Sequence, residues 1–162
     1  MGITIIAAVG KNNELGKNND LIWRFKEDMS FFRENTMNKP IVMGLNTFKS
    51  LPKVLPHRKH IVISDAPVEL PDEVTVVHSM DELLNTIHSY TQTGEEVMII
   101  GGASIYAQFI KYADRLLLTE VDASSPADVY FPTFDKTEWE RTVLSKQEEN
   151  GVAFEHVEYV KK

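Results

Sequence analysis

Hydrophobic residues gather in short runs along this chain, and polar segments separate the runs. Predominantly apolar runs rich in β-branched residues occupy positions 3–9, 41–44, 60–64, 74–77, 97–100 and 115–121. A short run of this kind suits a strand that is buried on both faces, as in a parallel sheet. We expect residues 3–9 to form a central strand of such a sheet.

The polar stretches carry helix and turn signals. Ser79 and Glu82 have the spacing of a capping box for a helix that reaches about Tyr90, and residues 45–50 are typical of the start of a short helix. Asn150–Gly151 lies between two β-rich segments and is the strongest short hairpin signal in the chain. The pattern predicts one compact α/β domain with an antiparallel strand pair at one edge.

One predicted helix has an acidic residue on its apolar face. At about 100° per residue, its apolar stripe contains Phe25, Asp28, Met29 and Phe32. An unpaired carboxylate in an apolar setting is costly and normally raises its pKa. Asp28 is therefore a candidate proton-handling group. The alternative is a first-turn aspartate that complements the helix dipole and reaches water.

Glycines lie at two predicted junctions between a strand and a helix. Gly44 ends one strand, and Gly101 and Gly102 end another. Such a junction lets an anion approach the free N–H groups at the start of the helix, at the edge where α/β sheets bind ligands. The alternative at each junction is a tight turn that needs glycine only for its geometry.

Residues 10–20 form a long connector that contains four asparagines and two glycines. A loop of this length in a compact domain is often a lid or a binding loop. The alternative is a surface loop without a function.

Composition narrows the class of protein. The formal net charge is -7, which argues against broad binding to nucleic acid. There is no cysteine, and no apolar run approaches the ~18 residues of a membrane span. The start of the chain lacks a secretory signal pattern. We expect a cytoplasmic monomer with no membrane or nucleic-acid partner.

The histidines offer little chemistry at this stage. His57 and His60 have a spacing seen in metal sites, but no acidic or cysteine residue accompanies them in their basic loop. We expect both on the solvated surface, and we expect no metal site.

Several segments, taken in order, carry a resemblance to a known family. They are Ile6-Ala7-Ala8, Gly16, the spacing from Trp23 to Asp28, Phe32, Ile41-Val42-Met43-Gly44 with Thr47-Phe48, Leu55-Pro56 with Arg58-Lys59, Ile100-Gly101-Gly102 with Ile105-Tyr106, Leu118-Thr119, and Asp128 before Phe131-Pro132. The sequence resembles bacterial dihydrofolate reductases from end to end. The resemblance implies a single domain over residues 1–162, with an eight-stranded, mostly parallel twisted sheet, an antiparallel C-terminal edge hairpin and about four flanking helices.

The resemblance also implies NADPH as hydride donor, 7,8-dihydrofolate as substrate and antifolates as inhibitors. The implied catalytic residues are Asp28, Trp23, Leu21, Thr119 and Tyr106. The implied substrate contacts are Ile6, Ala7, Asp28, Phe32, Leu51, Leu55, Arg58, Ile100 and Thr119. The implied cofactor contacts are Ala8, Leu15, Gly16, Gly44, Leu45, Asn46, Thr47, Ile63, Ser64, Asp65, His78, Gly101, Gly102, Ala103, Ser104, Ile105, Tyr106 and Gln108.

A few positions depart from the family pattern. Ile22 replaces the usual proline before Trp23, and His57 and Ala127 each replace a glycine, so their backbone must avoid positive φ or accept strain. Leu45 and Asp65 stand where relatives usually place groups that bind the 2′-phosphate of the cofactor.

Two other functions fit a chain of this kind. One is a reductase of the same fold that acts on another heterocycle, such as a pyrimidine of riboflavin synthesis. The other is a ligand-binding protein that has lost turnover.

Overall fold

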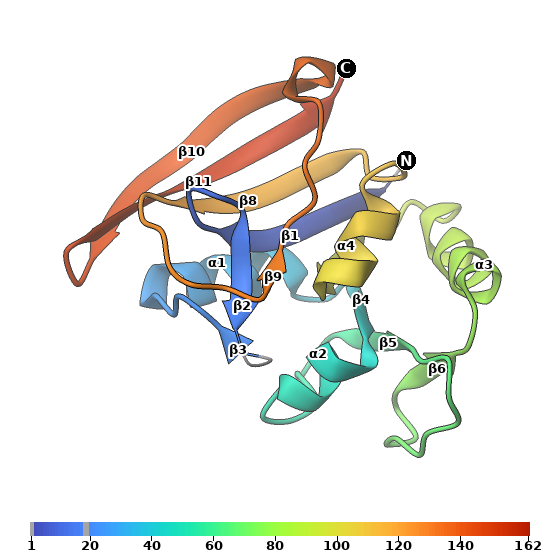
Figure 1. The fold of residues 1–162 in the computed structure, drawn as a ribbon. Coiled ribbons are helices and arrows are strands. Elements are labelled where there is room, and N and C mark those ends of the chain that lie inside the picture. The colour runs from blue at the N-terminus through green and yellow to red at the C-terminus, as the bar shows by residue number, and fades with distance from the viewer. Residues whose placement is uncertain (1, 18–19) are drawn as a thin grey trace.

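The computed structural model describes residues 2–17 and 20–162, and at Asp20 and Leu21 it describes the backbone alone. Its centre is an eight-stranded sheet with the order β10-β11-β8-β1-β7-β4-β5-β6 (Figure 1). The strands are β1 (Ile3–Val9), β4 (Pro40–Gly44), β5 (Lys59–Ile63), β6 (Thr75–Val77), β7 (Val97–Gly101), β8 (Arg115–Val121), β10 (Trp139–Glu149) and β11 (Val152–Lys161). The six strands from β8 to β6 are parallel to one another, and the β10–β11 hairpin adds the antiparallel edge. This confirms the predicted fold class and the central place of β1.

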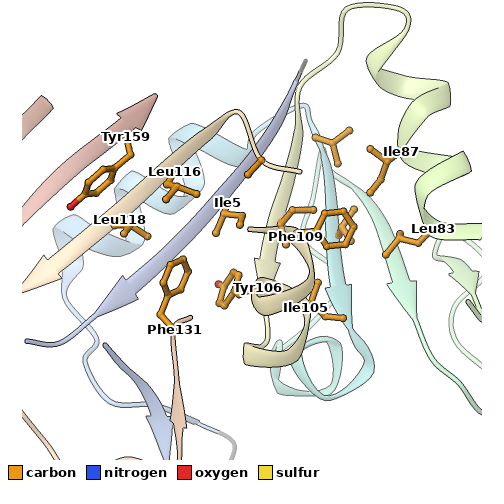
Figure 2. Packing of buried hydrophobic residues seen from close by; sticks show 14 of the residues in the cluster. Ile5, Leu83, Ile87, Ile105, Tyr106, Phe109, Leu116, Leu118, Phe131 and Tyr159 are labelled. Carbon is orange, nitrogen blue, oxygen red and sulfur yellow. The ribbon is translucent and has the colours of Figure 1, made fainter. Parts of the chain in front are cut away.

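Helices cover both faces of this sheet. They are α1 (Lys26–Thr36), α2 (Leu45–Ser50), α3 (Met80–Thr91) and α4 (Ala103–Phe109), with a short 3-10 helix η1 (Lys136–Glu138) before β10. Side chains of α3 and α4 pack with one set of strand residues, shown in Figure 2, whereas Phe31 and Phe32 of α1 and Phe48 of α2 pack with the other set. Alternate strand residues such as Ile5 and Ile6 therefore enter different cores, which explains the unbroken apolar runs.

The long connector after β1 contains secondary structure that we did not predict. Strands β2 (Glu14–Lys17) and β3 (Asp20–Leu21) pair with each other, and β2 also pairs with β9 (Val129–Tyr130). The order of this second sheet is β3-β2-β9. Asn18 and Asn19 of the predicted loop lie outside the described residues. The connector was unpredictable as a strand because β9, its partner, follows more than 100 residues later in the chain.

The buried face of α1 differs from the predicted stripe. Met29 is 62% exposed, so its placement in the apolar stripe was wrong. Phe25 precedes the helix as its N-cap in extended backbone, and its ring stacks on Phe154 at 4.4 Å. The inward face instead contains Asp28 with Phe31, Phe32 and Thr36, which follow it at intervals of three, four and eight residues.

The hairpin and the Ser79 cap of α3 form as predicted, while the reciprocal bond of Glu82 goes to the residue before the N-cap. Asn150 and Gly151 both have positive φ, of 54° and 78°, as a two-residue hairpin turn requires. Ser79 Oγ accepts a hydrogen bond from Glu82 N, and the Glu82 carboxylate accepts one from His78 N. In the described part of the chain, no helix is long and apolar enough to cross a membrane.

Candidate functional site

Asp28 projects from α1 toward two residues that face each other across β8 and β11. The Thr119 hydroxyl donates a hydrogen bond to Asp28 Oδ1, and His156 Nε2 lies 3.4 Å from the same oxygen. Thr119 and His156 are register partners and are 2% and 3% exposed, while the Asp28 side chain is 21% exposed. The carboxylate is thus held from below by the sheet and remains open on one side.

The surroundings of this carboxylate are apolar. Residues expected at the substrate side belong to one cluster on this face of the sheet: Ile6 and Ile100 are buried in it, and Phe32, Leu51 and Leu55 pack against it at its edge. Ala7, the next residue of β1, is partly buried and packs against the cluster on the opposite face of the sheet. The side chain of Leu21, a predicted catalytic residue, lies outside the described residues.

Trp23 lies between α1 and the start of the connector. It packs with Phe25 and Phe154, and its ring approaches Gly10 so closely that a Cβ there would lie 2.4 Å from it. The same Cβ would lie 2.4 Å from Glu14 Oε1. Gly10 is therefore required by the close approach of two side chains.

Glu14 is a buried carboxylate that organises this connector. Its oxygens accept hydrogen bonds from the backbone N–H groups of Asn12 and Ser125, at 2.7 and 3.0 Å. Burial raises the pKa of Glu14, but these hydrogen bonds outweigh it and lower the pKa below its ordinary value. Gly16, a predicted cofactor contact, accepts a hydrogen bond from Asp128 N, so the connector is tied to the segment before β9.

Tyr106 is buried beneath the site. Its hydroxyl lies 2.8 Å from the backbone carbonyl oxygens of both Ile6 and Ile100, which share its single proton, and so it bridges β1 and β7. Burial, and then the negative charge of Asp28, raise the pKa of Tyr106 well above its ordinary value. The hydroxyl therefore stays protonated and holds the strands, and Tyr106 supports the site from behind.

The two predicted glycine junctions lie against each other. A Cβ built on Gly101 or Gly102 would lie 3.2 or 3.3 Å from Thr47 Oγ1 of the other junction, and Gly101 has φ of +139°. Neither α2 nor α4 has a side-chain cap hydrogen bond among the described residues, in contrast to α3. Ala103, Ser104 and Asn46 are at least partly exposed here. This edge thus offers backbone N–H groups at the starts of two helices.

The other predicted cofactor contacts continue along the same edge. Ile63 ends β5, Ser64 is buried and donates its hydroxyl to the Ala66 carbonyl, and Asp65 is exposed. His78 Nδ1 lies 2.9 Å from the Ser64 carbonyl oxygen.

Leu45 packs against the apolar cluster on the α1 face. The remaining members are spread around this edge: Ala8 and Leu15 are partly buried, Ile105 is buried and Gln108 is exposed.

The loop before β5 carries Arg58 and is fastened by His60. Arg58 Nε donates to the Pro56 carbonyl at 3.1 Å, and among the described residues no carboxylate pairs with this guanidinium within 4.0 Å. Burial and the charge of Arg33 lower the pKa of Arg58. A cavity of about 480 Å³ lies beside it, lined by Val54, Leu55, Pro56, His57, Arg58, Lys59 and Glu73.

The two histidines of this loop behave differently. His57 is exposed as predicted and accepts a positive φ of 60° in place of glycine, whereas Ala127 avoids positive φ. The prediction that His60 is solvated was wrong, since it is 1% exposed. Its Nε2 accepts from Leu55 N at 3.1 Å and its Nδ1 lies 3.0 Å from the Arg58 carbonyl oxygen. Within the described residues, no group of three or more acidic, histidine or cysteine side chains could hold a metal ion.

Comparison with known proteins gives a family for this arrangement. The family model described as dihydrofolate reductase matches residues 2–161. The chain belongs to the dihydrofolate reductase family. It is 37% identical to the dihydrofolate reductase of Bacillus subtilis (strain 168), over 99% of this chain and 95% of that protein. It is 40% identical to that of Neisseria gonorrhoeae, over 99% and 98%, and 38% identical to dihydrofolate reductase type 3 of Salmonella typhimurium, over 97% and 96%.

Membership of the dihydrofolate reductase family supports dihydrofolate reductase activity for this chain, with a small-molecule substrate and a nicotinamide cofactor. Sequence reasoning missed two residues near the site. One is Glu14, and the other is His156, whose position opposite Thr119 depends on the register in which β11 pairs with β8. The Asn150–Gly151 turn signals the β10–β11 hairpin, but no local pattern gives the register of β11 on β8, so the sequence held no signal for the place of His156.

Proposed function

We propose that this protein reduces 7,8-dihydrofolate to 5,6,7,8-tetrahydrofolate with NADPH, in the cytoplasm and as a monomer. The observation that carries the proposal is Asp28, a partly exposed carboxylate held by Thr119 inside an apolar surround. A carboxylate in that setting can bind the amidine edge of a pterin with two hydrogen bonds and handle a proton. The family membership favours this substrate over another heterocycle.

Residues of this chain can supply substrate binding and protonation. Asp28 would orient the pterin ring and favour protonation at N5 through water, and Trp23 would hold that water. Phe32, Leu51 and Leu55 would enclose the flat part of the substrate. Arg58, which has no carboxylate partner within 4.0 Å among the described residues, would pair the glutamate carboxylate of the substrate in bidentate fashion.

The adjoining glycine junctions fit a cofactor with a pyrophosphate. Backbone N–H groups at Leu45–Thr47 and Ala103–Ile105 would hold the phosphates, and a side chain at Gly101 or Gly102 would crowd Thr47 of the other junction. When bound, reduced nicotinamide supplies the hydride that is added to pterin C6. Ala7 and Ala8, which are small and partly exposed on β1, would let the two rings approach each other.

The test follows the near-ultraviolet absorbance of NADPH when enzyme and dihydrofolate are mixed. We expect turnover in the wild type and a loss of roughly 10²-fold or more in Asp28→Asn, because a proton-transfer group is removed. Glu27→Gln, a change one residue away on the exposed side of α1, is the matched control and should alter turnover less than about twofold. Tight binding of NADPH and dihydrofolate without turnover would instead favour a binding protein. Turnover of a pyrimidine of riboflavin synthesis in place of dihydrofolate would favour the other reductase.

A further inference from the structure

His156 is a buried histidine whose ring faces the Asp28 carboxylate. Its Nε2 atom lies 3.4 Å from Asp28 Oδ1 and has no hydrogen-bond partner of regular geometry among the described residues. Buried polar atoms are nearly always paired, so an unpaired one needs an explanation. Catalytic hydrogen bonds are often long in a protein without its substrate and tighten when the substrate binds.

Three contacts fix the orientation of this imidazole. Its ring stacks on Phe31 with 3.9 Å between centroids and an angle of 5°, and packs against Phe154 at 5.7 Å. Its Nδ1 lies 3.2 Å from Ser145 Oγ of β10. A flip of the ring would turn Nδ1 away from Ser145 and Nε2 away from Asp28.

The partners also select the protonation pattern of the neutral ring. An ionised carboxylate only accepts hydrogen bonds, so Nε2 must carry a proton to face Asp28 favourably. Nδ1 is then bare and accepts from the Ser145 hydroxyl, which can donate. Among the described residues, the charged group that contacts the imidazole is Asp28 of α1. The neighbouring strands β8 and β10 present the uncharged Thr119 and Ser145.

We propose that His156 is a positioning residue that donates its Nε2–H to Asp28 Oδ1 beside the Thr119 hydroxyl. This inference rests on the proposed function, because Asp28 is the group on which His156 acts. Two donors from adjacent strands hold one oxygen in place and so orient the carboxylate toward the substrate. Removal of the imidazole would leave the ionised carboxylate with one donor fewer, and a donor favours the ionised form.

The test compares His156→Phe with His156→Gln. Phenylalanine keeps the stack on Phe31 but removes the donor, and we expect kcat/KM for dihydrofolate to fall about tenfold, as for loss of one hydrogen bond to a charged group. We assign to Asp28 the midpoint in the pH profile of kcat/KM that is lost in Asp28→Asn. In His156→Phe this midpoint should move to higher pH. Glutamine carries an N–H near the position of Nε2 and should restore most of the activity. His88→Gln, on the exposed end of α3, is the control for loss of an imidazole. It should change neither kcat/KM nor the midpoint of its pH profile.

A double-mutant cycle separates this role from a general effect on structure. In the Asp28→Asn background, adding His156→Phe should change kcat/KM by less than about twofold, because the group that His156 positions is gone. Equal losses from His156→Phe in both backgrounds, or a wild-type pH profile in His156→Phe, would overturn the proposal.

Ring ¹⁵N chemical shifts of His156, compared between wild type and Asp28→Asn, give a readout without turnover. A change in these chemical shifts on Asp28→Asn supports the contact between His156 and Asp28, and unchanged shifts refute it. Failure of the wild type to reduce dihydrofolate would refute the proposed function and leave this readout intact.

Discussion

At the scale of single residues, the neighbours of a side chain decide its chemistry. Asp28 and Glu27 are adjacent acidic residues on α1, yet one faces Thr119 and the other faces solvent. His57 and His60 lie three positions apart, and one is exposed while the other is almost fully buried. Residue type alone does not distinguish the members of either pair.

Arg58 allows a prediction about substrate affinity. Because the glutamate tail lies remote from the reacting atoms, it is bound equally in the ground state and the transition state. Arg58→Ala should therefore raise KM for dihydrofolate far more than it lowers kcat, with a loss of ~1.5–3 kcal/mol. Steady-state kinetics with a pteridine that lacks the tail is the control and should show no effect. Equal losses on both substrates would mean that Arg58 stabilises its loop instead.

Leu45 and Asp65 allow a prediction about cofactor preference. We expect NADPH to be the better donor, but by a narrower margin than in relatives with an arginine after the glycine of β4. Leu45→Arg should improve kcat/KM for NADPH over NADH about 10- to 150-fold, the range of ~1.5–3 kcal/mol for one charge-assisted bond, and more at low salt. Leu45 packs in an apolar cluster, so Leu45→Gln is the control for lost packing. An unchanged ratio would show that this side chain does not reach the 2′-phosphate.

At the scale of elements, the segments that carry the site are fastened by groups distant in the chain. The α1 helix has no cap from its own N-cap residue Phe25. Both carboxylate oxygens of Glu149, at the tip of the β10–β11 hairpin, accept from Lys26 N at 3.0 and 3.1 Å. The loop before β5 is instead fastened locally, because His60 contacts the backbone of Leu55 and Arg58, five and two residues before it.

Removal of the Glu149 cap should weaken α1. We expect Glu149→Ala to lower the free energy of unfolding by about 0.5–2 kcal/mol, through loss of a capping acceptor and of a negative charge at the helix N-terminus. Urea denaturation measures the effect. Glu148→Ala, at the exposed neighbouring position, should be nearly neutral. A Glu149→Ala variant as stable as Glu148→Ala would contradict the capping role.

His60 should make the loop before β5 sensitive to pH. Burial lowers the pKa of His60 from its ordinary value of 6.5, so the folded protein binds fewer protons than the unfolded chain as the pH falls below 6.5. Stability should therefore fall with pH in this window, by at most about 1.4 kcal/mol per pH unit, until the pH reaches the lowered pKa. His60→Asn should reduce this slope in denaturation curves, and exposed His88→Asn should not. An unaltered slope in His60→Asn would mean that other groups cause the pH dependence.

At the scale of the whole molecule, one sheet carries the site and both cores. We propose that the chain is a single domain, since β1 contributes to the core on each face. Glu96 ties the start of the central strands together: Thr4 Oγ1 donates to it, and Lys39 Nζ and Arg115 Nη1 lie 2.6 and 3.4 Å from its oxygens.

Glu96 should contribute stability that acid removes. Burial raises its pKa, but the hydrogen bonds of Lys39 and Thr4 and the charge of Arg115 outweigh burial, so the pKa is lowered from 4.5. Its contribution is therefore present above pH 4.5 and is lost as the pH falls through the lowered value. Glu96→Gln should cost about 1–3 kcal/mol near neutral pH, with a smaller cost in acid. Denaturation curves from neutral to acid pH measure this loss, with exposed Glu95→Gln as the control. A loss of free energy of unfolding in Glu96→Gln that does not depend on pH would refute the argument.

The sequence by itself determined what depends on neighbours along the chain. The strand runs, the helix cap at Ser79 and the hairpin at Asn150–Gly151 are local patterns, and each formed where it was predicted. The glycine junctions were equally visible, because a turn between a strand and a helix is also local.

Only the tertiary structure decided which distant groups meet. Met29 faces solvent because α1 is rotated to place Asp28, Phe31 and Phe32 against the sheet. The connector after β1 becomes a strand because β9 lies beside it, and His156 reaches Asp28 because β11 pairs with β8 in one register. Pairing between strands far apart in the chain depends on loop closure and packing of the whole molecule, and no local pattern encodes it.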